Sequence, residues 1–262
     1  MNPEFGLCNL SLVPLRTEPS DKSEMCSQLL FGDHFQILES NDKWTRIETA
    51  FDEYEGWVDN KQFAKIEMDL FVQLHSLNCV LGTGSATHKV TNTQTGEYQY
   101  LMAGSNLPYI NDTSFLLDGV KYNLESPAVL PALEDFKNSI TDAAMYYLNS
   151  PYLWGGKSLF GIDCSGFTQV VMRQFGIRIK RDAWQQAEQG ELVAFLQEVK
   201  PGDLAFFDNE EGRIVHVGIM LDTNRIIHAS GKVRIDPIDN QGIYDTERNR
   251  YTHQLRIVRR MV

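Results

Sequence analysis

The spacing of the hydrophobic residues changes at Pro131, and this change limits what the chain can fold into. Before Pro131, apolar and polar residues alternate in short runs separated by turns, which is the pattern of half-buried strands. After it, Leu133, Phe136 and Ile140 recur at helical spacing, and a second helical pattern and several apolar strands follow. Helices followed by a run of antiparallel strands predict an α+β fold for the C-terminal part of the chain.

The chain divides into three predicted domains. Residues 1–66 contain five short strands, which is typical of a small β-barrel. Residues 67–131 have a pattern that predicts further β-strands, with a hairpin turn at residues 93–96, and they end in a Pro-containing linker. Residues 132–262 carry the helices, including a short one capped by Asp182, and the antiparallel sheet.

Composition and charge argue against several classes of function. The chain has 24 Lys and Arg against 35 Asp and Glu, a net charge of −11, so it lacks the basic surface that binds nucleic acid or an anionic membrane. Neither a membrane-spanning apolar run nor the pattern of a signal peptide is visible, which predicts a cytoplasmic protein unless a leader was removed. Four cysteines without a CxxC pair, and no histidine cluster of zinc spacing, predict no disulfide scaffold, no metal and no cofactor.

Cys164 is the cysteine whose surroundings indicate a catalytic role. It lies at the first turn of the second predicted helix, where free backbone amides and the helix dipole lower the pKa of a thiol. Gly166 would let a substrate or another backbone segment approach closely. A buried cysteine at a helix start would look similar, so the position alone leaves both readings open.

Two histidines follow on consecutive predicted strands. His216 lies in an apolar strand, where a lone histidine is more often a satisfied core residue than a catalytic one. His228 lies in the next strand, and the turn at residues 221–224 would place the two imidazoles side by side in an antiparallel pair. Nucleophilic catalysis needs a thiol, a base that takes its proton and a polar group that holds the base.

The segments around these residues resemble the NlpC/P60 family of papain-like cysteine peptidases. The motifs that carry the resemblance are residues 163–167, 216–219 and 226–230, supported by residues 151–156, 181–183 and 200–204. Over residues 133–262 the resemblance implies a papain-like domain with helices packed on an antiparallel sheet. It makes Cys164 the nucleophile, His216 the general base and His228 the residue that orients it, and the Cys164 amide part of an oxyanion hole.

The N-terminal part resembles the bacterial SH3 domain that precedes the peptidase in enzymes of the dipeptidyl-peptidase VI type. The segments concerned are residues 16–20, 28–33 and 54–58. Those enzymes hydrolyse murein peptides with a free N-terminal L-Ala after the γ-D-Glu residue, and release L-Ala-γ-D-Glu. The resemblance implies that the first SH3 domain closes one end of the substrate cleft. It also implies that Glu18, Tyr54 and Asp163 bind the ammonium group of the substrate.

Four further residues are assigned to the substrate site by the same resemblance. Ser165 and Asp182 match the pair that lines the substrate, Arg181 supports Asp182 or a carboxylate, and Trp154 lines the pocket. Ordinary alternatives exist for four of the substrate-site residues: a solvated loop position for Glu18, barrel packing for Tyr54, a helix cap for Asp163 and packing beside two glycines for Trp154. Ala183 stands where some relatives carry a hydroxyl residue. Residues 67–131 resemble a second SH3-like domain only loosely.

The expected protein is therefore a monomeric cysteine peptidase that acts on free murein tripeptides or tetrapeptides in cell-wall recycling. One alternative is an exported hydrolase that acts on intact peptidoglycan through an open cleft. Another is a non-catalytic protein that binds wall peptides. The presence of Cys164, His216 and His228 together argues against the non-catalytic alternative.

Overall fold

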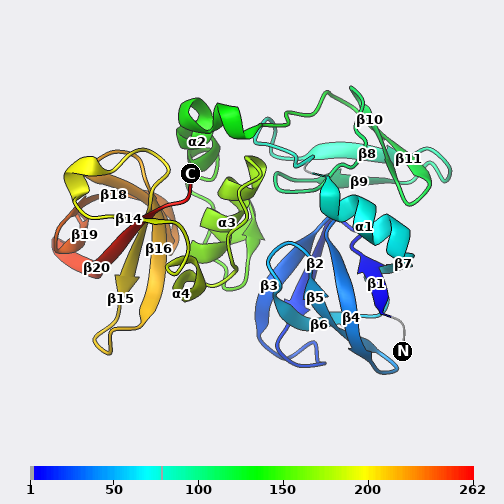
Figure 1. The fold of residues 1–262 in the computed structure, drawn as a ribbon, viewed down its shortest axis with the longest axis horizontal. Helices are drawn as coiled ribbons and strands as arrows, with labels where there is room; N and C mark the ends of the chain where they lie inside the picture. The colour runs from blue at the N-terminus through cyan, green and yellow to red at the C-terminus, as the bar shows by residue number, and fades with distance from the viewer. Residues whose placement is uncertain (1–2, 78) are drawn as a thin grey trace. The chain divides into compact units, whose positions relative to one another are not determined.

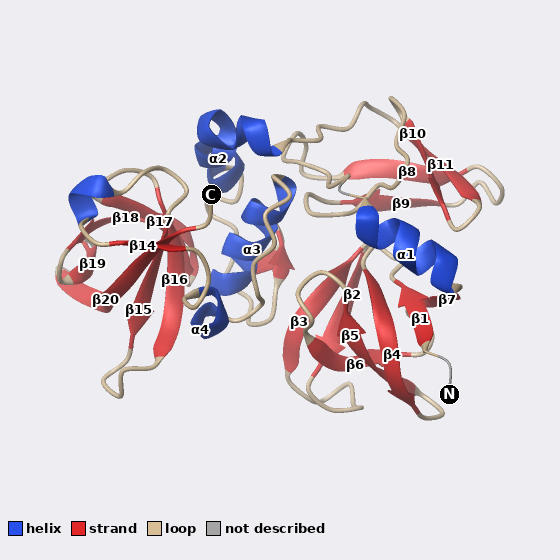
Figure 2. Cartoon of the chain, in the orientation of Figure 1, coloured by secondary structure: helices blue, strands red, loops and turns tan. Residues whose placement is uncertain are grey.

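The computed structural model describes residues 3–77 and 79–262, and the chain separates at Pro131 into two compact units (Figure 1). The boundary falls at the proline where the hydrophobic period changes. Strands dominate both units, and most of the helix is in the second one (Figure 2). Within the described ranges no helix is long and apolar enough to cross a membrane.

The first part of the N-terminal unit is a seven-stranded antiparallel sheet in the order β3-β2-β6-β5-β4-β1-β7. Its strands are β1 (Glu4–Leu7), β2 (Leu12–Arg16), β3 (Met25–Leu30), β4 (His34–Ser40), β5 (Trp44–Thr49), β6 (Glu55–Asp59) and β7 (Ala64–Ile66). The alternation predicted for the strands before Pro131 is present in β4, where Phe35 and Ile37 are buried while Leu38 is exposed. The buried faces enclose one apolar cluster that includes Val13, Leu15 and Ile47.

The second part of this unit begins with a helix where the sequence analysis predicted β structure. Helix α1 (Met68–Ser76) places Leu70, Phe71 and Leu74 on one side, and the Phe71 ring stacks on Phe5 with centroids 4.2 Å apart. The prediction was wrong because this apolar set has the helical spacing of three and four residues rather than two. The helix therefore covers apolar residues of the first sheet.

A four-stranded antiparallel sheet completes the N-terminal unit, in the order β10-β11-β8-β9. Its strands are β8 (His88–Asn92), β9 (Tyr98–Leu101), β10 (Ser114–Leu117) and β11 (Val120–Leu124). The predicted hairpin across residues 93–96 is confirmed as the β8–β9 pair. Phe31 of the first part packs edge-on against Phe115 and Tyr122 of this sheet, so both parts share one core.

The C-terminal unit combines short helices with a long sheet. Its helical segments are η1 (Leu133–Asp135), α2 (Phe136–Met145), α3 (Cys164–Gln174), α4 (Ala183–Gln186) and η2 (Leu196–Glu198). Phe136 and Ile140 of α2 are buried as predicted, whereas Leu133 is exposed in the preceding 3-10 turn. Helix α4 starts after Asp182, whose backbone amide donates to Oε1 of Gln185 at 3.1 Å. Helix α3 packs on strands β16 and β17 of the sheet.

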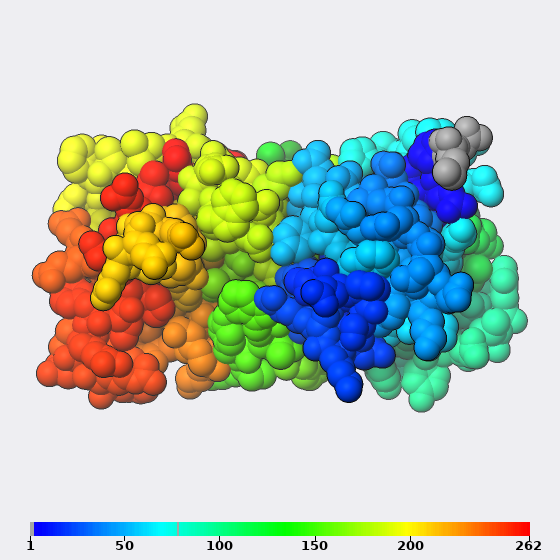
Figure 3. All heavy atoms as spheres, turned by 90° about the horizontal axis from the view of Figure 1, so that it is seen from below, coloured from blue at the N-terminus to red at the C-terminus, as the bar shows by residue number. Residues whose placement is uncertain are grey.

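Six strands of the C-terminal unit close into a barrel. The strands of the unit are β12 (Lys157–Ser158), β13 (Gly161–Ile162), β14 (Glu191–Val193), β15 (Leu204–Asp208), β16 (Ile214–Met220), β17 (Arg225–Ser230), β18 (Lys232–Asp239), β19 (Gly242–Asp245) and β20 (Arg250–Arg260). The sheet order is β14-β20-β15-β16-β17-β18-β19, and β19 also pairs with β20. The turn between β15 and β16, residues 209–213, is exposed (gold in Figure 3).

Candidate active site

Cys164 is the first residue of α3, and two elements fix its position. The side chain of Asp163 caps the helix by accepting a hydrogen bond from the Gly166 amide at 2.6 Å. The Cys164 thiol accepts a hydrogen bond from the backbone amide of Val217 in β16. Val217 directly follows His216 in the chain, so the thiol lies against the strand that carries the predicted base.

The pKa of the Cys164 thiol is raised to about 12, which differs from the sequence prediction. Burial is the main cause, and the negative charge of Asp163 acts in the same direction. The hydrogen bonds from the Val217 and Ser165 amides favour the thiolate but do not offset the burial. The prediction of a lowered pKa was wrong because it considered the helix terminus and not the loss of solvent around the sulfur. The free protein therefore holds a thiol that needs a base to become a nucleophile.

The structure brings the two predicted histidines together. Nε2 of His216 lies 2.8 Å from Nδ1 of His228, and both side chains are buried. Their strands β16 and β17 are antiparallel neighbours, with Gly218 opposite His228. The pairing of the strands across the short turn at residues 221–224 is the arrangement that the sequence predicted.

A third polar group extends the His216–His228 contact, and it is one that no sequence motif indicated. Nε2 of His228 lies 2.9 Å from Oδ2 of Asp236 on β18. Asp236 is buried and also accepts hydrogen bonds from Arg234, at 2.7 Å from Nε and 2.8 Å from a terminal nitrogen. The available signal was Arg234 and Asp236 alternating with apolar residues directly after the His228 strand, because such alternation places both on one face of the next strand.

His253 was also missed. Its ring stacks on the His216 ring, with centroids 4.2 Å apart and an interplanar angle of 25°. It lies on β20, two strands from β16 and far along the chain, so no local spacing connects it with His216. Burial and the neighbouring His228 lower the pKa of His253 to about 4, against the opposing effect of Asp236. A neutral imidazole therefore covers one face of His216.

His216 is held in its neutral form in the free protein. Its pKa lies well below the ordinary value, first because of burial and then because of His228 and His253. Together with the raised pKa of Cys164, this describes a neutral thiol on α3 and a neutral imidazole on β16, the strand against which α3 packs. Such a pair can transfer its proton when a carbonyl group is presented to the sulfur.

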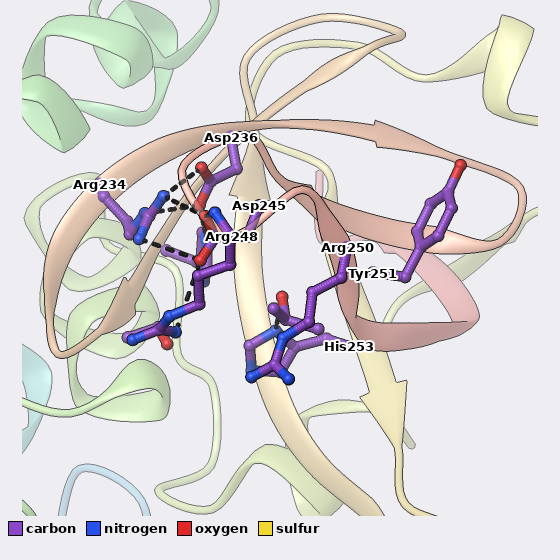
Figure 4. Close-up of a pocket in the computed structure, with 10 residues that line it drawn as sticks. Arg234, Asp236, Asp245, Arg248, Arg250, Tyr251 and His253 are labelled. Carbon is purple, nitrogen blue, oxygen red and sulfur yellow. Dashed lines mark hydrogen bonds and ion pairs between the residues drawn. The ribbon is translucent and has the colours of Figure 1, made fainter.

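A cavity of ≈310 Å³ adjoins the histidines on the β17–β20 side of the barrel (Figure 4). It is lined by His228, Ser230, Arg234, Asp236, Asp245, Arg248, Arg250, Tyr251, Thr252 and His253. Arg234 is bonded to both Asp236 and Asp245, as the dashed lines of Figure 4 show. The carboxylate that contacts His228 is therefore held from its other side by an arginine.

Asp163 and Arg181 form a buried ion pair at the start of α3. Two guanidinium nitrogens of Arg181 lie 3.1 and 2.7 Å from the two carboxylate oxygens. The backbone amides of Gly166 and Gly155 donate to the same carboxylate at 2.6 and 2.8 Å. Arg181 also donates to the Ser165 hydroxyl at 2.8 Å. Four N–H groups thus occupy the Asp163 carboxylate, and the carboxylate that Arg181 contacts here is Asp163.

Gln186 of α4 fixes the backbone behind Cys164. It donates to the carbonyl groups of Ser165 and Lys180 at 3.0 and 2.8 Å, and accepts from the Thr168 hydroxyl at 2.8 Å. Its side chain is fully buried. The first turn of α3 is therefore bonded to α4 as well as to Arg181.

The remaining predicted substrate residues lie as follows. Trp154 is 61% exposed in the loop before β12, and Asp182 is half-buried before α4. In the N-terminal unit, Glu18 is exposed in the loop after β2, and Tyr54 is half-buried directly before β6. Their roles toward a substrate stay predictions. Over residues 3–77 and 79–262, no three His, Cys, Asp or Glu side chains lie together in a way that could hold a metal ion.

Comparison with known proteins decides the family. The model of the NlpC/P60 family matches residues 149–252, the segment that contains Cys164, His216 and His228. The probable endopeptidase NlpC of Escherichia coli is 37% identical over 123 residues, which cover 45% of this chain and 79% of that protein. The chain belongs to the NlpC/P60 family. It is a cysteine peptidase of that family, with the predicted nucleophile and histidines inside the matched segment.

Longer NlpC/P60 relatives extend over most of the chain. The gamma-D-glutamyl-L-lysine dipeptidyl-peptidase of Bacillus cereus is 26% identical over 253 residues, which cover 85% of this chain and 73% of that enzyme. The dipeptidyl-peptidase 6 of Lysinibacillus sphaericus is 25% identical over 261 residues, which cover 88% of this chain and 90% of that enzyme. Residues 15–63 match the model of the bacterial dipeptidyl-peptidase SH3 domain.

A solved structure shows the same fold for this NlpC/P60 peptidase. The crystal structure of an NlpC/P60 family protein from Bacillus cereus aligns with a TM-score of 0.80 and 20% identity, covering 98% of this chain and 99% of that one. The predicted combination of an NlpC/P60 domain with an SH3-like domain is confirmed.

Proposed function

We propose that the protein hydrolyses the bond between γ-D-Glu and the diamino acid in murein peptides with a free N-terminal L-Ala, and releases L-Ala-γ-D-Glu. The observation that carries the proposal is the Cys164 thiol against Val217, the residue after His216, together with the contact between the imidazoles of His216 and His228. The relatives that match most of the chain are named gamma-D-glutamyl-L-lysine dipeptidyl-peptidases or dipeptidyl-peptidase 6. Those names supply the bond and the dipeptide product.

The proposed reaction begins with proton transfer from Cys164 to His216. The thiolate attacks the γ-carbonyl carbon of D-Glu, and the Cys164 backbone amide at the start of α3 donates to the developing oxyanion. His216 then gives its proton to the leaving amine of the diamino acid. Water hydrolyses the thioester, again with His216 as the base, and the free thiol returns. His228 keeps the His216 ring in place throughout.

The proposed specificity for a free amine rests on charge. An ammonium group in a site away from bulk water needs a carboxylate or a phenol oxygen as partner. Glu18 and Tyr54 lie within residues 15–63, the segment that matches the dipeptidyl-peptidase SH3 model, and we propose that they contact the ammonium. Asp163 already accepts four N–H groups, so we propose that it acts on the amine through its charge.

We further propose that the natural substrates are released tripeptides or tetrapeptides and that the enzyme works as a cytoplasmic monomer in cell-wall recycling. A requirement for a free N-terminal amine supports released peptides over intact peptidoglycan. In this proposal residues 1–66 close the substrate cleft and residues 67–131 are a second SH3-like domain.

Cleavage of L-Ala-γ-D-Glu-diamino acid tripeptide, compared with the same peptide N-acetylated, tests the proposal. Two or three charge-assisted hydrogen bonds, each about 1.5–3 kcal/mol, predict on the order of a thousandfold higher kcat/KM for the free amine. Equal cleavage of both peptides would contradict the proposal and favour a hydrolase of intact peptidoglycan. Cleavage of neither, with binding intact, would favour the non-catalytic alternative.

A further inference from the structure

Asp236 is the last residue of a chain of hydrogen bonds that begins at His216, the predicted base. These bonds run from Nε2 of His216 to Nδ1 of His228 at 2.8 Å, and from Nε2 of His228 to the Asp236 carboxylate at 2.9 Å. All three side chains are buried, with His228 at 1% exposure. Bulk solvent therefore reaches little of their surface.

Asp236 is held in its ionised form. Burial opposes its charge, but the hydrogen bonds from His228 and Arg234 outweigh the burial and hold the pKa of the carboxyl below its ordinary value. Arg234 is itself held by a second carboxylate, Asp245, at 3.5 Å. An ionised carboxylate is only an acceptor, so the atom of His228 that faces it must carry a proton.

The position of that proton determines the others along these hydrogen bonds. A neutral His228 that donates from Nε2 has its lone pair on Nδ1 and can only accept from His216. His216 must then donate from its own Nε2, which leaves Nδ1 unprotonated. A general base needs this unprotonated nitrogen, and the reverse tautomer would present an N–H to the thiol instead.

We infer that Asp236 is a positioning residue that sets the tautomers of His228 and His216, and thereby keeps Nδ1 of His216 available as the base for Cys164. Asp236 touches neither the thiol nor the substrate in this scheme and acts only through His228. The inference rests on the proposed nucleophile and base and adds a fourth residue to them.

Nitrogen NMR of the full chain labelled with ¹⁵N-histidine tests the inference directly. The chain has six histidines, and His216→Gln and His228→Gln identify the two signals of interest. In the wild type at neutral pH, we expect the proton of both imidazoles on Nε2. A wild-type spectrum with the proton of His216 on Nδ1 would overturn the inference without any variant of Asp236.

The variant Asp236→Asn connects the tautomer with the reaction. The amide is equal in size but can donate as well as accept, so we expect the Nε2-protonated form of both histidines to lose its dominance. With the tripeptide as substrate we expect kcat to fall about 100-fold or more and KM to change less than threefold, since general acid–base catalysis contributes this much. An unchanged tautomer, or a kcat within fivefold of the wild type, would overturn the inference.

Asp203→Asn is the matched control. Asp203 is an equally buried aspartate before β15, and it forms a two-point ion pair with Arg260 at 2.9 and 2.7 Å without contacting a histidine. We expect this variant to keep the wild-type histidine signals and kcat while it loses a similar ion pair. Loss of kcat in both variants to the same extent would assign the effect to stability and contradict the inference.

These experiments distinguish failure of the proposed function from failure of the inferred role of Asp236. If the wild type cleaves no murein peptide, the proposed function fails, but the tautomer of His216 is still measured by NMR. Alkylation of Cys164 by iodoacetamide provides a rate without a peptide, and we expect Asp236→Asn to lower it at pH 7 and Asp203→Asn to leave it unchanged. An alkylation rate unaffected by Asp236→Asn would count against the inference alone.

Discussion

Asp163 and Arg181 are joined by two hydrogen bonds of 3.1 and 2.7 Å, and the side chain of Arg181 is only 1% exposed. The arginine thus brings a full positive charge into the protein, where it acts on the Cys164 thiol. The aspartate that precedes Cys164 balances this charge and caps α3 at the same time. One carboxylate therefore stabilises both the helix start and the buried guanidinium.

Replacement of Asp163 should reduce stability strongly. Asp163→Ala leaves Arg181 buried without its carboxylate, and breaking a buried pair in this way costs about 3–5 kcal/mol. Urea unfolding measures the loss as a lower free energy of unfolding. Glu4→Ala is the control, because its pair with Lys65 is exposed and worth about 0–1 kcal/mol. Similar losses in the two variants would refute the structural role of Asp163.

Removal of the thiol should abolish hydrolysis without unfolding the protein. Cys164→Ala deletes the nucleophile, and we expect less than a few per cent of the wild-type rate on the tripeptide. The free energy of unfolding should change by about 1 kcal/mol or less, because the substitution removes one small atom beside the Val217 amide. A higher residual rate would contradict the assignment of Cys164 as nucleophile.

Stability should fall in mild acid because of the histidines. The pKa of His253 is about 4 in the folded protein, whereas an unfolded histidine titrates near its ordinary value of 6.5. The unfolded chain therefore binds more protons between these values, and His216 acts in the same direction. The stabilisation is fully present above pH 6.5 and is lost as the pH falls toward 4.

Unfolding free energies at pH 7, 6, 5 and 4.5 measure this effect. His253→Phe retains an aromatic ring to stack on His216 and removes one titrating group, so its loss of stability in this range should be smaller than that of the wild type. A free energy of unfolding that stays constant or rises as the pH falls would show that the histidines are not the cause.

The preference for a free amine should depend on Glu18 and Tyr54. We expect Glu18→Gln and Tyr54→Phe each to lower the ratio of kcat/KM for free over N-acetylated tripeptide by about tenfold or more, since each removes one partner of the ammonium group. Alkylation of Cys164 should stay at the wild-type rate. Glu24→Gln, in the same loop, is the control. An unchanged ratio in both variants would assign amine recognition to other residues.

The sequence predicted what depends on local spacing. Helix α3, the hairpin of β8 and β9 and the meeting of His216 with His228 follow from periods and short turns. Helix α1 was missed because a nine-residue segment between β regions was read with the period of its neighbours. The family resemblance supplied roles that no spacing alone could give.

What the sequence could not predict depends on contacts between distant segments. The direction of the Cys164 pKa follows from burial under β16, which is not visible in the residues around the cysteine. Asp236 meets His228 diagonally, since Arg234 is the residue directly opposite it, and this register exists only in the paired strands. His253 reaches His216 only because the last strand returns to the same sheet.

The pairing of β19 with β20 closes the barrel opposite β16 and β17. The distances between His216, His228 and Asp236 therefore depend also on the hydrogen bonds of that far side. In an open sheet, one strand can slip by a residue against its neighbour and turn its side chains to the other face. In a closed ring, a register shift between β17 and its neighbour must be matched by a shift at another pair of strands. The hydrogen bonds of that second pair would then break as well. The spacing between His216, His228 and Asp236 is therefore protected by every strand of the ring, including those that carry none of these three residues.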